Sequence, residues 1–105
     1  FQPHRYSRTK DFFEEFVTVL SRVDELLLLD IYAAGEDVIP EINSEWLSTS
    51  IAKRGIIKPI YVEHIEIVPI LLNDVVRDGD LVLTQGAGSV SKLVEMLQAV
   101  KGDVP

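Results

Sequence analysis

A short basic segment at the start of the chain concentrates the side chains best suited to bind an anion. Residues 1–9 read Phe-Gln-Pro-His-Arg-Tyr-Ser-Arg-Thr, in a chain that is acidic overall. A guanidinium group presents a planar pair of donors that matches a carboxylate or a phosphate, so Arg5 and Arg8 are the leading candidates. Two structural alternatives stay open, namely a solvated loop or an ion pair of Arg5 with Asp30 or Glu36.

The composition indicates one acidic globular domain that spans residues 1–105. The formal net charge of −7 argues against nucleic acid as a partner, because binding to a phosphate backbone relies on Lys and Arg. The absence of cysteine excludes disulfides, thiolate metal ligands and a thiol nucleophile. The same absence of cysteine agrees with a cytoplasmic location, which we expect. No apolar run approaches about 20 residues, so we expect no membrane span.

Four stretches carry apolar residues at the spacing of an α-helix. They are about Thr9–Ser21, Ser44–Arg54, Val68–Arg77 and Val90–Val100. Thr9 is the predicted N-cap of the first helix, which leaves residues 4–8 as a loop. Asn43 or Ser44 is predicted to cap the second helix, and Gly55 to end it.

Strands are predicted where short apolar runs are bounded by turn residues. The four leucines at 26–29 do not alternate with polar residues, which favours a strand buried on both faces over a short helix. Ile60–Val62 and Leu81–Thr84 are further candidates, and Phe1–Pro3 reads as the end of another strand. The alternation of strands and helices predicts an α/β fold, a three-layer Rossmann-like domain with a mostly parallel sheet and helices on both faces.

The loops that follow three strand ends are predicted to meet at one edge of this sheet. They come after Pro3, Tyr32 and Thr84, and would bring Arg5, Arg8, Glu36 and Gly86 to a common side. The small residues Ala33, Ala34 and Gly35 could admit a ligand close to the backbone, and an ordinary connection explains them equally well.

The turn of Gly86, Ala87 and Gly88 precedes a predicted helix and could cradle an anion. It lacks the spacing of the known phosphate-binding glycine motifs, so a tight turn that needs small residues stays an alternative.

Three segments of the chain also match sequence motifs of a known enzyme family. They are FQPHRYSRT at Phe1–Thr9, DIYAAGE at Asp30–Glu36 and DGDLVLTQGAG at Asp78–Gly88. In order and spacing they resemble the Mur ligases that add L-alanine to UDP-N-acetylmuramic acid, over nearly the whole chain. One departure is that Ser89 and Val90 stand where the family usually has Asn or Asp and then Ile.

The resemblance implies the C-terminal domain of a three-domain enzyme, without that domain's first strand and helix. The start at Phe1 agrees with this, and we expect a piece of a longer polypeptide. The family uses ATP and Mg²⁺ and forms an acyl phosphate, which the amino group of L-alanine attacks, in cytoplasmic peptidoglycan synthesis. Because its P-loop, magnesium ligands and UDP site lie in the two other domains, this chain would hold no catalytic residue and would be inactive alone.

By similarity, the substrate-binding residues would come from all three segments. They would be His4, Arg5, Arg8, Tyr32, Ala33, Ala34, Gly35, Gly86, Ala87 and Gly88. A bidentate arginine would hold the carboxylate of L-alanine while its amine reacts, or offset charge on the phosphoryl group.

Two other functions remain as alternatives. One is a free-standing α/β binding module without a catalytic role. The other is a Mur-type ligase that adds a different amino acid or a peptide, against which the His-Arg-Tyr-Ser-Arg run at residues 4–8 argues.

Overall fold

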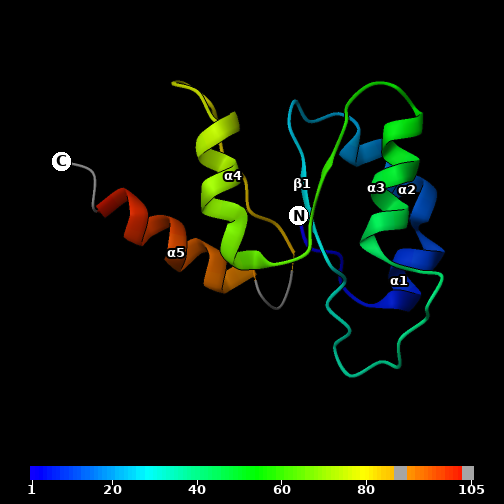
Figure 1. Ribbon diagram of the computed structural model, residues 1–105. Coiled ribbons are helices and arrows are strands. Elements are labelled where there is room, and N and C mark those ends of the chain that lie inside the picture. Colours follow the sequence, from blue (N-terminus) through cyan, green and yellow to red (C-terminus); the bar gives the residue numbers. More distant parts are fainter. Residues whose placement is uncertain (87–89, 103–105) are drawn as a thin grey trace.

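Helices and short parallel strands alternate along the chain and form an α/β fold (Figure 1). The computed structural model describes residues 1–86 and 90–102. The elements are α1 (Tyr6–Asp11), α2 (Phe13–Leu20), β1 (Leu27–Leu29), α3 (Ser44–Lys53), β2 (Ile60–Val62), the 3₁₀ helix η1 (Ile65–Ile67), α4 (Val68–Val75) and α5 (Val90–Gly102). Across these described ranges, no helix has the length and apolar character needed to cross a membrane.

The sheet is built around β1, which pairs on both of its edges. On one edge β1 runs parallel to β2, with Leu28 opposite Tyr61. On the other edge lies the extended segment 1–5, where Leu29 N donates to Phe1 O at 2.9 Å and Arg5 N donates to Tyr32 O at 2.8 Å. Segment 1–5 in turn reaches residues 85–86 through a parallel bridge between Gln2 and Gly86. The spatial order is therefore 85–86, 1–5, β1, β2.

The leucines of β1 point alternately into two separate apolar clusters. Leu28 is fully buried and belongs to the cluster with α2 and α3, which also contains Leu47 and Ile51. Leu29 packs with Val62 and with residues of α4 and α5. Figure 1 shows α2 and α3 on one side of β1, and α4 and α5 on the other. A strand with both faces covered explains the unbroken leucine run.

The predicted ends of α3 and the predicted position of β2 are confirmed. Asn43 is the N-cap of α3, where its Oδ1 accepts a hydrogen bond from Trp46 N at 2.8 Å. Gly55 follows the helix with φ +75°, a left-handed conformation that glycine adopts without strain. β2 covers Ile60–Val62 as predicted.

The predicted start of the first helix is wrong, and so is the loop at residues 4–8. α1 begins at Tyr6, and the helix is interrupted at Phe12, where φ is −112° and ψ is 26°. Thr9 lies inside α1, where its hydroxyl donates to Arg5 O at 2.8 Å instead of capping the helix. A Thr hydroxyl can bond either forward as a cap or back to the i−4 carbonyl, and sequence alone does not separate the two.

The buried strand predicted at Leu81–Thr84 is also wrong. These residues form no strand, and Leu81 is 90% and Leu83 72% exposed. A hollow of about 400 Å³ has both Asp24–Leu27 and Asp80–Gln85 in its walls, together with residues of α4 and α5. An apolar run becomes a strand only when backbone partners lie beside it. The predicted turn at Asp78–Asp80 is present, with Arg77 N donating to Asp80 Oδ2 at 2.8 Å.

Replacing Leu28 with Ala should remove about 3 kcal/mol of unfolding free energy, because the side chain is fully buried and leaves a cavity. Leu81→Ala, at a 90% exposed position, should change it by no more than about 0.5 kcal/mol. Urea denaturation followed by circular dichroism measures both. Equal losses in the two variants would mean that residues 81–84 are packed as a strand after all.

Candidate functional site

His4, Tyr32 and Arg8 come together at the edge of the sheet where β1 ends. His4 and Tyr32 form a parallel bridge, and their rings stack with centroids 6.0 Å apart and planes 16° apart. Arg8 Nη1, from the first turns of α1, lies 3.2 Å from His4 Nδ1. Because a guanidinium carries donors only, Nδ1 accepts in this contact. Two of the predicted substrate-binding residues, Arg8 and Tyr32, thus each contact a third, His4.

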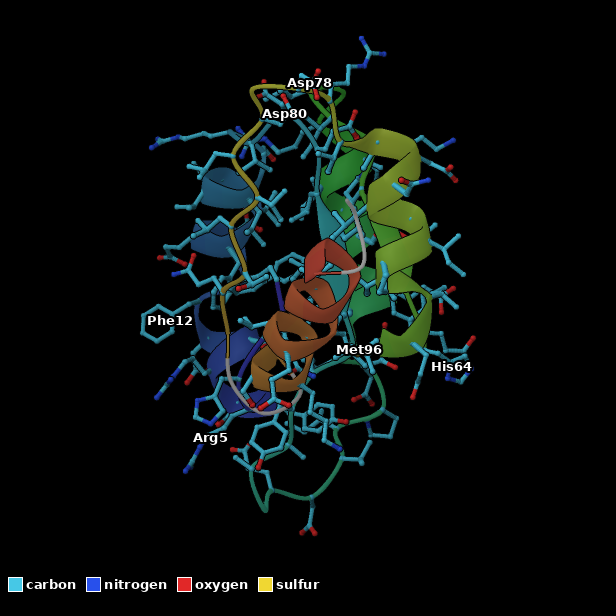
Figure 2. The ribbon with its side chains drawn as sticks, turned by 90° about the vertical axis from the view of Figure 1, so that its left-hand side faces the viewer. Arg5, Phe12, His64, Asp78, Asp80 and Met96 are labelled. Atoms are coloured by element: carbon cyan, nitrogen blue, oxygen red, sulfur yellow. The ribbon has the colours of Figure 1, made fainter. Side chains whose placement is uncertain are left out.

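Arg5 combines a strained backbone with an exposed side chain. Its φ is 68°, in the left-handed region that residues other than glycine rarely adopt. The conformation is held from both sides, since Arg5 N donates to Tyr32 O and Arg5 O accepts from Thr9 N at 3.2 Å. Figure 2 shows Arg5 at the surface, with Asp78 and Asp80 toward the opposite end of the molecule. The guanidinium group of Arg5 is therefore open to a ligand.

The predicted small-residue loop is a tight turn that sends Glu36 back toward α1. Ala34 and Gly35 have φ of 53° and 86°, and Glu36 N donates to Ala33 O at 3.1 Å. Positive φ at both central positions is the geometry of a type I′ turn. The Glu36 carboxylate then accepts hydrogen bonds from Ser7 Oγ and, at 3.2 Å, from Ser7 N.

The pKa of Glu36 is lowered from its ordinary value of 4.5. The hydroxyl of Ser7 contributes most, partial burial acts in the opposite direction, and the amides of Ser7 and Tyr6 and the charge of Arg5 add to the lowering. Each donor stabilises the ionised carboxylate and so favours the loss of its proton. Glu36 is thus set to stay negatively charged beside the start of α1.

The acid groups proposed as ion-pair partners of Arg5 have other hydrogen-bond donors. Asp30 Oδ1 accepts from the hydroxyl of Tyr61 at 2.6 Å, and Glu36 accepts from Ser7. Burial, followed by this hydrogen bond and the charge of Asp30, raises the pKa of Tyr61. Ser7 and Tyr61 are not predicted from sequence as partners of these carboxylates. Ser7 is 29 residues from Glu36 and Tyr61 is 31 residues from Asp30, and no local pattern signals either pairing.

Gly86 is placed by a close approach of two backbones. It bridges to Gln2, and with φ +136° a Cβ at this position would collide with Gln2 O. This supports the structural reading of the glycine, a turn that needs a small residue. Ala87 and Gly88, the rest of the predicted anion cradle, lie outside the described residues.

A second hollow, of about 250 Å³, opens at the carboxyl ends of β1 and β2. Its walls are Gln2, Leu29, Asp30, Val62, Glu63, His64, Ile65 and Glu66. Its acidic lining contrasts with the basic edge formed by His4, Arg5 and Arg8. Nowhere in residues 1–86 and 90–102 do three or more His, Asp or Glu side chains form a group that could hold a metal ion.

The edge therefore presents two exposed guanidinium groups, of Arg5 and Arg8, beside the stacked His4–Tyr32 pair. Such an arrangement can bind a carboxylate or a phosphate. A comparison of the chain with protein-family models finds no match.

Gly86→Ala should lower the unfolding free energy by about 3 kcal/mol, because the new Cβ collides with Gln2 O in addition to the cost of positive φ. Gly55→Ala is the matched control. It also has positive φ but nothing within 4 Å of a new Cβ, so it should lose only about 1 kcal/mol. Chemical denaturation of both variants checks this. A loss at Gly86 no larger than at Gly55 would contradict the close approach of the two backbones.

Glu36→Gln should destabilise the chain at neutral pH and make no difference in strong acid. A carboxylate whose folded pKa is lowered contributes stability above its ordinary value of 4.5, and this contribution is lost as pH falls through the folded pKa. Urea denaturation at a series of pH values should therefore show a difference in unfolding free energy between wild type and Glu36→Gln at neutral pH. This difference should disappear as the pH falls through the lowered pKa of Glu36. Asp37→Asn, at an exposed neighbouring position, is the control and should have the same unfolding free energy as wild type at every pH. A difference for Glu36→Gln that is constant with pH would rule out the charged contact.

Proposed function

We propose that this chain is the C-terminal domain of a Mur ligase, the ATP-dependent enzyme that joins L-alanine to UDP-N-acetylmuramic acid. The observation that carries the proposal is that two of the family-like segments meet. Segment 1–9 and segment 30–36 contact each other through the His4–Tyr32 stack and the Ser7–Glu36 hydrogen bonds. The motifs suggested by sequence thus contribute to one edge, as the parts of a shared binding site would.

The basic edge suits the amino-acid end of such a reaction. L-Alanine carries a carboxylate that must be held while its amine attacks an acyl phosphate, and Arg5 and Arg8 offer exposed guanidinium groups for this purpose. The stacked rings of His4 and Tyr32 give the site one rigid wall. A ligand bound there would be oriented by charge on one side and by flat aromatic surface on the other.

The described residues do not fit a magnesium site, since they lack a suitable group of His, Asp or Glu side chains. By the resemblance, Mg²⁺ and the P-loop for ATP would belong to the central domain of the longer enzyme, and the UDP site to its N-terminal domain. The chain then acts in the cytoplasm as one half of a composite site and is inactive alone.

The finer fold, a three-layer Rossmann-like domain, is part of the same proposal. It is supported by the parallel order 85–86, 1–5, β1, β2 and by helices on both sides of β1.

The test is kinetic and uses the full polypeptide with all three domains. It should release phosphate from ATP only when L-alanine and UDP-N-acetylmuramic acid are both present. Arg8→Ala should lower kcat/KM for L-alanine by about tenfold or more, because a charged hydrogen bond to the carboxylate is lost. Arg22→Ala, which removes an exposed arginine beyond the end of α2, is the control and should behave as wild type.

Two outcomes would count against the proposal. Wild-type kinetics in Arg8→Ala would remove Arg8 from the site, and absence of alanine-dependent phosphate release would end the ligase assignment. The isolated chain distinguishes the alternative function, since saturable binding of ATP or L-alanine near Arg5 and Arg8, followed by NMR, would favour a free-standing binding module.

A further inference from the structure

The start of α1 is held by a carboxylate from a distant loop. Its own N-cap residue, Arg5, makes no side-chain cap hydrogen bond. The orphan amide of Ser7 donates instead to Glu36 Oε1, and the Ser7 hydroxyl donates to Glu36 Oε2. We infer that this pair, the Glu36–Ser7 clasp, sets the position of α1 and so makes Glu36 a positioning residue for the arginines of the proposed site. The inference rests on the proposed function for its consequence in catalysis.

α1 has few contacts of its own beyond the backbone hydrogen bonds at Arg5, the buried Thr9 and its junction with α2. It spans Tyr6–Asp11, far shorter than a helix that is stable by itself in water. Thr9 is its one buried residue, so apolar packing on the body of the protein is slight. A carboxylate that accepts from the first-turn donors satisfies groups that the helix leaves unpaired. The clasp therefore supplies the N-terminal cap hydrogen bond that the side chain of Arg5 does not make.

The backbone strain of the site lies in the two loops that the clasp joins. Arg5 and Ala34 are the residues other than glycine with positive φ in the part of the chain that the structure describes. One precedes α1, and the other lies in the turn that carries Glu36. Strained conformations persist only where the surroundings fix them. By tying the two loops together, the clasp restrains both.

The clasp reaches the ligand-facing groups through one neighbouring residue. Arg8 follows Ser7 in α1, and its Nη1 contacts His4, which is stacked on Tyr32. A shift of the first turn of α1 would thus move Arg8 away from the His4–Tyr32 pair. Glu36 would change the binding of the amino-acid carboxylate without touching it.

Amide hydrogen exchange on the 105-residue chain tests the clasp without any ligand. The reporters are the amides of Thr9 and Phe12, which donate within the first helix to Arg5 O and Arg8 O. In Glu36→Gln and in Ser7→Ala both should exchange about fivefold faster. Exchange at the amide of Leu47 in α3 should rise by no more than the loss of unfolding free energy in the urea experiment accounts for, and Asp37→Asn should change none of the three amides.

Wild-type exchange at Thr9 and Phe12 in both variants would overturn the clasp. If Glu36→Gln speeds exchange at Leu47 by as large a factor as at Thr9 and Phe12, it has only loosened the whole chain, and Ser7→Ala, which keeps the charge, then decides alone.

Kinetics of the full polypeptide test the positioning role. Glu36→Gln should raise KM for L-alanine about fivefold and leave KM for ATP within about twofold of wild type, with Asp37→Asn changing neither. Faster exchange together with an unchanged KM for L-alanine would mean that the clasp is structural only, which overturns the positioning role. If the wild-type polypeptide shows no ligase activity, the proposed function fails, while the exchange rates still decide whether the clasp exists.

Discussion

The backbone ladder between segment 1–5 and β1 is the interaction on which the rest of the structure depends. Leu29 N donates to Phe1 O and Tyr32 N to Pro3 O, both at 2.9 Å. This places residues 1–5 between β1 and residues 85–86, and it brings Phe1 against the apolar cluster of α2 and α3. The last bond of the ladder, from Arg5 N to Tyr32 O, brings the basic segment to the end of β1.

The same ladder explains why polar chemistry gathers at one edge. Parallel strands end on the same side, so the residues after each strand meet there whatever their distance along the chain. At this edge the chain must turn sharply twice, at Arg5 and at Ala34, and both turns use positive φ. Hydrogen bonds from Ser7 to Glu36 join the two turns. The strained backbone at Arg5 and Ala34 and the ordered side chains of Ser7 and Glu36 thus both result from the two sharp turns at this edge.

What the sequence predicts well is what local rules decide. The unbroken leucines require a strand covered on both faces, and Asn43 and Gly55 mark the ends of α3 through their own hydrogen bonding and φ. What it misses depends on distant partners. Leu81–Thr84 has the composition of a strand but no backbone beside it, and Glu36 finds Ser7 only once the sheet has formed. Arg8 is a candidate through the chemistry of its guanidinium group, whereas His4 and Tyr32 are candidates through the resemblance of their segments to family motifs and not through periodicity.

The exposure of the two arginines bears on what this edge can do by itself. Arg5 and Arg8 lie in solvent, where the attraction between unit charges is weakened by water and screened by salt. An anion held only by such groups binds weakly, as exposed ion pairs do. The same guanidinium groups become far more effective when a second surface covers them and excludes water. Exposed donors such as Arg5 and Arg8 would therefore bind an anion more tightly in the proposed composite site, where a second surface would cover them.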